Sequence, residues 1–263
     1  MVNAGGNGNI PARYQDRYQN GADELVLVFC DTEKKPHEQY EDIKRKINEF
    51  HGVDSAANEV IMFGNPCTMQ IISMFNIVCV THRKLCKNFF KRVGELYENN
   101  VPVILREKDL SESEYEELAK KVIEICPNVI LHSYINVAKK IGVKRIHLPL
   151  RLMNENIAKE FETVGVSVHS ADEAVLAEKM GATYVTAGHI FATDCKKGLE
   201  PRGIEFLKNA VSSVDIDVYG IGGISPENIG KIQNTGAKGG CIMSGFMKCD
   251  NVKKYLDETY KNY

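Results

Sequence analysis

Residues 219–228, with the sequence Tyr-Gly-Ile-Gly-Gly-Ile-Ser-Pro-Glu-Asn, contain the pattern that decides the fold. An apolar stretch ends in paired glycines, and Ser225-Pro226 then supplies an N-cap and a first-turn proline. We therefore expect a strand over residues 217–222 and a helix over residues 226–235. Gly236 stands where a left-handed C-cap would end that helix.

The same order of strand and helix recurs along the chain after residue 72. Eight apolar segments are predicted as strands: residues 76–81, 101–106, 129–133, 145–149, 165–169, 184–188, 217–222 and 240–244. The helices between them are amphipathic, and the helix over residues 111–126 begins with a capping box formed by Ser111 and Glu114. Alternating strands and helices imply parallel pairing with right-handed crossovers. Eight such units favour an α/β fold that is a closed (β/α)8 TIM barrel; the alternative is a doubly wound open sheet.

The chain before residue 72 has a different organisation. Residues 1–22 are polar and predict a disordered leader. Residues 23–72 predict a β-α-β extension, with strands over 24–30 and 59–63 and a helix over 38–50. About 50 ordered residues bury too little surface for comfortable stability alone, so we expect the extension to pack on the rest, to dimerise or to be a fragment. Residues 73–263 would form the barrel, and the function of the extension stays unassigned.

Composition excludes several classes of protein. The 263 residues carry 33 Lys and Arg against 35 Asp and Glu, a balance that gives no support to a nucleic-acid or anionic-membrane partner. No apolar run approaches the roughly 18 residues of a membrane helix, and the polar N-terminus is not a secretory signal. The 8 cysteines form no CxxC pair and fit no zinc-knuckle spacing, which is typical of buried thiols in a reducing compartment. We therefore expect a cytoplasmic protein.

In a TIM barrel, catalytic groups gather at the C-terminal ends of the strands. Five of the seven histidines fall there: His82, His132, His147, His169 and His189. His169 ends a strand in which Gly165 and Ser167 share its face, and these small residues would leave room at the barrel mouth. We expect His169 to act as a general acid/base; the alternative is a structural histidine.

Two glycine-containing loops predict a phosphate site. Gly222 and Gly223 follow the seventh strand, and Ser244 and Gly245 follow the eighth. Barrels commonly bind phosphate at these two loops, and glycines let backbone N–H groups approach an anion closely. The alternative is that these are plain turn glycines.

The third candidate is the long loop over residues 188–203, after the sixth strand. It is polar and basic, and Thr193 and Lys196 lie within it. The apolar pair Ile190-Phe191 and the helix expected after Gly203 favour an ordered lid. A solvated basic loop is the alternative for Lys197.

Four segments, residues 103–109, 165–170, 188–203 and 219–228, resemble the thiamine phosphate synthase/TenI superfamily. The resemblance covers about residues 76–250. It implies a (β/α)8 barrel of thiamine biosynthesis and suggests a homodimer. One branch, thiamine phosphate synthase, joins a hydroxymethylpyrimidine diphosphate to a thiazole phosphate with magnesium. The other branch, TenI, is a thiazole tautomerase that aromatises a thiazole carboxylate phosphate by moving a proton.

The synthase pattern is only partly present. Arg106 and Lys108 match its Gln-x-Arg-x-Lys motif, but Ile104 stands at the Gln position. Ser133 and Leu152 stand where the synthase has two magnesium-binding aspartates. Because magnesium needs hard oxygen ligands, this loss favours the TenI branch, with no metal bound.

The leading hypothesis is therefore a metal-independent thiazole tautomerase, an isomerase. His169 would move the proton, and Arg106 or Lys108 would hold the substrate carboxylate. His132 is a further expected substrate contact, while Thr193 and Lys196 would close over the phosphate. Two alternatives stay open: a thiamine phosphate synthase, a transferase that would need magnesium, and a non-catalytic or regulatory binder of thiazole or thiamine phosphates. In each case the expected ligand is a small phosphorylated thiazole compound.

Overall fold

The computed structural model describes residues 76–193, 196 and 198–261, together with the backbone of three short strands at 27–29, 60–63 and 69–72. The chain divides into two compact units between Met74 and Phe75. The predicted leader over residues 1–22 and the predicted helix over residues 38–50 lie outside the described residues.

The first unit contains a three-stranded sheet in the order β1 (Leu27–Phe29), β2 (Val60–Phe63) and β3 (Met69–Ile72). Strands β1 and β2 pair in parallel, as a β-α-β connection requires, and both fall inside the predicted strands. Strand β3 pairs antiparallel with β2 and was not predicted. It is only four residues long, too short to show a clear period in the sequence.

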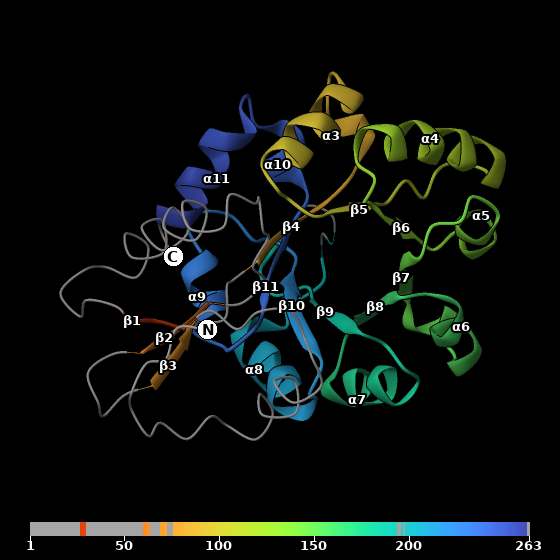
Figure 1. The fold of residues 1–263 in the computed structure, drawn as a ribbon. Helices are drawn as coiled ribbons and strands as arrows, with labels where there is room; N and C mark the ends of the chain where they lie inside the picture. Colours follow the sequence, from red (N-terminus) through yellow and green to blue (C-terminus); the bar gives the residue numbers. More distant parts are fainter. Residues whose placement is uncertain are drawn as a thin grey trace. The chain divides into compact units, whose positions relative to one another are not determined.

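The second unit is a closed parallel barrel, which confirms the predicted fold and excludes the doubly wound sheet (Figure 1). Its strands are β4 (Asn76–Val80), β5 (Val103–Leu105), β6 (Ile130–His132), β7 (Arg145–Pro149), β8 (Thr163–Val168), β9 (Tyr184–Gly188), β10 (Asp217–Ile221) and β11 (Gly239–Ile242). Neighbours in sequence are neighbours in the barrel, and β11 pairs with β4 to close it.

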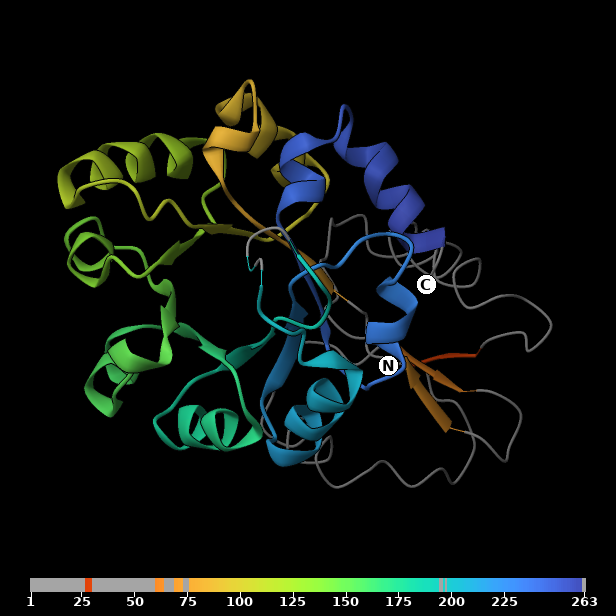
Figure 2. The ribbon, with the colours of Figure 1, turned by 180° about the vertical axis from the view of Figure 1, so that it is seen from behind.

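Helices surround the strands on the outside, as the two opposite views show (Figures 1 and 2). They are α3 (Phe89–Glu98), α4 (Glu112–Ile125), α5 (Ile135–Lys140), α6 (Glu155–Glu160), α7 (Ala171–Lys179), α8 (Gly203–Ser213), α9 (Ile229–Gln233), α10 (Ser244–Lys248) and α11 (Val252–Lys261), with 3-10 turns η1 (Arg83–Leu85) and η2 (Leu150–Leu152). Within the described residues, no helix combines the length and the apolar character needed to cross a membrane.

Helix ends follow local capping chemistry. The predicted capping box is present at α4, where Ser111 and Glu114 bond reciprocally. Helix α9 begins later than predicted, at Ile229. The Asn228 side chain explains this difference, because its Oδ1 accepts the Ser225 N–H at 3.0 Å and its amide donates to the Gly223 carbonyl at 2.8 Å. These bonds form a turn over residues 223–228, so the helix begins after Asn228 and Ser225 does not act as its N-cap.

The inside of the barrel is apolar on one side and polar on the other. Val78, Val80, Ile104 and Cys241 form the apolar cluster. On the polar side, the buried His147 ring bonds to the Tyr184 hydroxyl at 3.0 Å and to the Ser167 hydroxyl at 2.8 Å.

Gly165 makes this polar layer possible, because a Cβ there would lie 2.1 Å from the Tyr184 ring and 2.4 Å from His147 Nδ1. The space predicted at the mouth beside Gly165 is therefore filled by Tyr184.

Candidate active site

The parallel strands bring every predicted site residue to one end of the barrel, the mouth. The contributions follow strand order: Arg106 and Lys108 after β5, His132 at the end of β6, His169 after β8, Thr193 and Lys196 after β9, Gly222 and Gly223 after β10, and Ser244 and Gly245 at the end of β11. The sequence-based grouping of these residues therefore agrees with the topology, while their individual roles stay predictions.

A buried carboxylate that the sequence reasoning missed fixes the β4 and β5 ends of the mouth. Glu107 is 1% exposed and accepts bonds from the Thr81 hydroxyl at 2.7 Å, the Arg83 backbone N–H at 2.9 Å and the Arg83 guanidinium at 3.1 Å. Thr81 Oγ1 in turn accepts the Arg106 backbone N–H at 2.9 Å. Arg83 also forms two bonds to Asp109, at 2.6 and 2.8 Å. The Arg106-Glu107-Lys108 segment is thus anchored through its middle residue.

Four cations share the mouth. Partial burial lowers the pKa of Lys108, and the positive charges of Arg106, Lys196 and Arg151 lower it further. These groups follow three different strands, β5, β7 and β9, whose carboxyl ends lie at the same end of the barrel. Arg151, in η2 after β7, was not predicted; its only sequence signal was its place just beyond a strand end.

Two histidines form a stacked pair at the polar side of the barrel. His132 is 6% exposed and His147 is 2% exposed, and their ring centroids are 5.5 Å apart. Burial lowers the pKa of His132 to about 2 and that of His147 to about 3, with Arg106 contributing to both shifts. Both rings are therefore neutral near pH 7. His132 Nδ1 is bonded to the Ser133 hydroxyl at 2.7 Å, so this nitrogen already has a protein partner.

His169 lies on the surface, directly after β8. Its Nδ1 is 2.8 Å from the Gly188 carbonyl oxygen, which can only accept, so the proton resides on Nδ1. Its backbone N–H donates to Glu173 at 2.6 Å. These bonds join the ends of β8 and β9, so the imidazole is held in one orientation.

The loop after β9 is bonded to the loop after β10. The Ile190 N–H donates to the Ile221 carbonyl at 2.9 Å, and the Phe191 N–H donates to the Gly222 carbonyl at 3.0 Å. This close approach needs glycine, because a Cβ on Gly222 would lie 2.3 Å from His189 and one on Gly223 would lie 2.5 Å from the Ala192 carbonyl. Backbone contact between the two loops therefore accounts for both glycines, and both have positive φ.

The N–H groups at the predicted phosphate site are available to a ligand. In the described part of the chain, the backbone N–H groups of Gly222, Gly223, Ser244 and Gly245 donate to no protein acceptor. The loops that carry them are adjacent, because β10 pairs with β11. Two neighbouring turns with unbonded N–H groups are a suitable cradle for an anion.

The described residues do not fit a magnesium ion held by protein carboxylates. Leu152 packs against the hydrophobic core, and the Ser133 hydroxyl is bonded to His132. Both carboxylate oxygens of Glu107 already accept hydrogen bonds from Thr81 or Arg83. Among the residues that the structure describes, no group of three His, Cys, Asp or Glu side chains could hold a metal.

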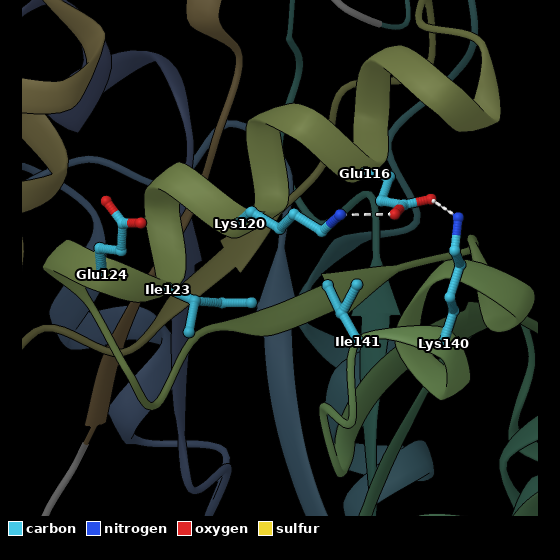
Figure 3. A pocket seen from close by; sticks show the side chains of 6 residues that line it. All are labelled: Glu116, Lys120, Ile123, Glu124, Lys140 and Ile141. Atoms are coloured by element: carbon cyan, nitrogen blue, oxygen red, sulfur yellow. Dashed lines mark hydrogen bonds and ion pairs between the residues drawn. The ribbon is translucent and has the colours of Figure 1, made fainter.

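A pocket lies between α4 and the end of α5, and none of the predicted site residues lines it (Figure 3). Glu116 bonds there to Lys120 at 2.7 Å and to Lys140 at 2.6 Å, so one carboxylate bridges two ammonium groups. Ile123 and Ile141 line the rest. All of its lining residues belong to α4 or to the end of α5, so we assign the pocket to the packing of these two helices.

Comparison with known proteins decides the family. The family model described as thiamine monophosphate synthase matches residues 77–246. The chain belongs to this family. The thiamine-phosphate synthase of Fusobacterium nucleatum is 32% identical over 199 residues, covering 71% of this chain and 96% of that protein. The one from Clostridium acetobutylicum is 34% identical over 191 residues, covering 68% and 90%.

Comparison with solved structures supports the same family and the same barrel fold. A thiamine phosphate pyrophosphorylase from Pyrococcus furiosus has a TM-score of 0.63 and 29% identity, covering 72% of this chain and 95% of that one. A 3-hexulose-6-phosphate synthase shares the fold, at a TM-score of 0.54 and 15% identity, covering 72% and 99%. The family is one of enzymes, in agreement with the sequence-based expectation.

The predicted tautomerase is wrong. Relatives that align over most of this family member's barrel are named thiamine-phosphate synthase, which supports the transferase that was kept as an alternative. The prediction gave two missing aspartates more weight than the likeness of the whole barrel. The proton-transfer role of His169 depended on the tautomerase and is withdrawn with it.

Proposed function

We propose that this protein is a thiamine-phosphate synthase, a transferase that couples a hydroxymethylpyrimidine diphosphate to a thiazole phosphate. The observation that carries the proposal is the pairing, at one barrel mouth, of a cationic group and two loops with unbonded N–H groups. The reaction has two anionic reactants, a diphosphate and a monophosphate. The mouth offers a separate anchor for each of them.

The reaction needs two contributions from the protein: it must position the two reactants, and it must stabilise the negative charge of the leaving group. The thiazole ring nitrogen attacks the methylene carbon of the pyrimidine, a C–N bond forms, and the C–O bond to the diphosphate breaks. The bonding pair leaves with pyrophosphate, and the thiazole becomes a thiazolium cation, so no proton is transferred. Fixing both reactants converts a bimolecular step into a unimolecular one. Fixed cations stabilise the negative charge that develops on the leaving diphosphate.

Each predicted site residue has a place in this scheme. The thiazole phosphate would accept bonds from the N–H groups of Gly222, Gly223, Ser244 and Gly245. Arg106 and Lys108, held in place through Glu107, would bind the diphosphate. Thr193 and Lys196 would cover the reactants from the loop after β9. His132 would form the neutral wall beside the pyrimidine, and His169 would position the end of β9.

The synthase branch uses magnesium, and the residues that the structure describes do not form a carboxylate site for it. We therefore assign no step to a metal. In this scheme the negative charge of the diphosphate is balanced by the basic side chains at the mouth.

A coupling assay with the full chain tests the proposal. Both substrates are supplied in magnesium-containing buffer, and thiamine phosphate and pyrophosphate are quantified by chromatography. We expect the two products in equal amounts. The variant Ser244→Asp places a negative charge at the phosphate loop, and we expect it to raise the KM for the thiazole phosphate at least tenfold through like-charge repulsion. Absence of thiamine phosphate with the wild-type chain would refute the proposal.

A further inference from the structure

Tyr255, in α11, places its side chain against the segment that follows β11. Its ring packs edge-on against the fully buried Phe246 ring, with centroids 5.2 Å apart. A Cβ on Gly245 would lie 2.0 Å from the Tyr255 hydroxyl oxygen and 2.5 Å from the ring carbon that bears it. Gly245 does not have a positive φ, so its backbone conformation does not require glycine. The absence of a side chain there is instead what makes room for the Tyr255 hydroxyl.

The hydroxyl lies close to the Gly245 N–H group. A Cβ is about 2.5 Å from the backbone nitrogen of its own residue, so the Tyr255 hydroxyl oxygen lies within about 4.5 Å of the Gly245 nitrogen. The hydroxyl also lies towards the start of α10, because the Cα–Cβ bond of a helical residue tilts in that direction. The Ser244 and Gly245 N–H groups of the predicted phosphate site are at this same place.

Neither donor has a partner among the residues that the structure describes. The Tyr255 hydroxyl forms no hydrogen bond there, and the Gly245 N–H donates to no protein acceptor. Burial, together with the charge of Glu227, raises the pKa of Tyr255 to about 12, so the hydroxyl keeps its proton near pH 7. Hydrogen bonds to an oxygen are about 2.7 Å long from a hydroxyl and about 2.9 Å from an N–H group. These two lengths together exceed the separation of the donors, so one ligand oxygen can accept from both.

We propose that the Tyr255 hydroxyl is a further phosphate ligand, which donates to an oxygen of the thiazole phosphate together with the Gly245 N–H. This inference rests on the proposed transferase function, which supplies the phosphate. The donor is held in place before the substrate binds, because Val252 and Leu256 anchor α11 in the core and Phe246 packs against the tyrosine ring. A hydroxyl that donates to a charged phosphate oxygen forms a stronger bond than one that donates to a neutral acceptor.

Calorimetric titration of the full chain with the thiazole phosphate tests the inference. Tyr255→Phe removes the hydroxyl and keeps the ring that packs against Phe246. We expect this variant to bind the thiazole phosphate at least tenfold more weakly, the usual effect of losing a hydrogen bond to a charged group. The control Tyr97→Phe removes the hydroxyl of an exposed tyrosine of α3 and should change the affinity less than twofold.

Two further measurements separate a phosphate contact from a structural role. Without ligand, Tyr255→Phe should unfold at the wild-type temperature, because the hydroxyl has no partner to lose among the described residues. In the coupling assay, the variant should raise the KM for the thiazole phosphate and change the KM for the pyrimidine diphosphate less than twofold. A lowered unfolding temperature together with equal increases in both KM values would show a structural role and overturn the inference.

The titration and the coupling assay distinguish the two proposals. Equal affinity of Tyr255→Phe and the wild type for the thiazole phosphate, or no binding by the wild type, would overturn the inference. Coupling by the wild-type chain with unchanged affinity in the variant would leave the transferase function standing. Weaker binding by the variant without coupling by the wild-type chain would refute the transferase function and leave the phosphate contact standing.

Discussion

Removal of the Glu107 carboxylate should destabilise the barrel and loosen the cationic mouth. In Glu107→Ala, the Thr81 hydroxyl, the Arg83 N–H and one Arg83 guanidinium N–H lose an acceptor within a nearly solvent-free site. Arg83 keeps its two bonds to Asp109, which limits the loss. Leaving buried donors unpaired costs about 1–3 kcal/mol each, and breaking a buried ion pair costs about 3–5 kcal/mol. We therefore expect a loss of about 3 kcal/mol of unfolding free energy.

Urea and thermal unfolding of purified variants measure this loss. About 3 kcal/mol corresponds to a fall in Tm of roughly 6–12 °C for a domain of this size. Glu107→Gln keeps an acceptor oxygen without the charge, so we expect about 1 kcal/mol. The control Glu124→Ala removes an exposed glutamate of α4 and should stay within about 0.5 kcal/mol of the wild type. Glu107→Ala with wild-type stability would refute the role assigned to this carboxylate.

Three other predictions follow from the interior. Both His132 and His147 have pKa values lowered in the folded state, so only the unfolded state binds their protons below about pH 6.5. Unfolding free energy should therefore fall as the pH drops from 6.5 towards 3, by up to about 2.7 kcal/mol per pH unit, and His132→Gln should halve this slope; an unchanged slope in equilibrium unfolding would contradict the assignment. Gly165→Ala forces a Cβ into the Tyr184 ring and should lower unfolding free energy by roughly 3 kcal/mol, measured by urea unfolding, and a variant as stable as the wild type would disprove the packing. Burial raises the pKa of Cys241 to about 12, so this thiol should react with a disulfide reagent at pH 8 only after unfolding, and rapid modification in the native protein, located by mass spectrometry, would argue against it.

The barrel was predictable because its strands are short apolar runs bounded by polar turns. Every predicted barrel strand lies within two residues of an observed one at either end, and the capping box at Ser111 was correct. The start of α9 was not predictable, because Ser225-Pro226 and Asn228 compete for the same turn. Only the folded geometry shows that the Asn228 side chain bonds on both sides.

The site was predictable in place but not in its electrostatics. The strand ends located Arg106, Lys108 and the glycine loops, because parallel strands share one edge. Glu107 was missed because its partners Thr81 and Arg83 lie 24 or more residues away, and the register of β4 against β5 decides that contact. Arg151 was missed because it lies in the turn after β7, far in the sequence from Lys108, whose pKa its charge lowers. The reaction was mispredicted because two absent side chains were given more weight than a barrel-wide likeness.

The claim that this chain couples the two substrates is tested most directly by carbon-13 NMR of the pyrimidine methylene group. The pyrimidine diphosphate is labelled with carbon-13 at its methylene group and mixed with thiazole phosphate and a stoichiometric amount of the full chain. The account predicts that the methylene signal moves from a carbon bonded to oxygen to a carbon bonded to nitrogen, in step with the release of pyrophosphate. A methylene carbon that stays bonded to oxygen, in unreacted substrate or in the hydrolysed alcohol, would contradict it.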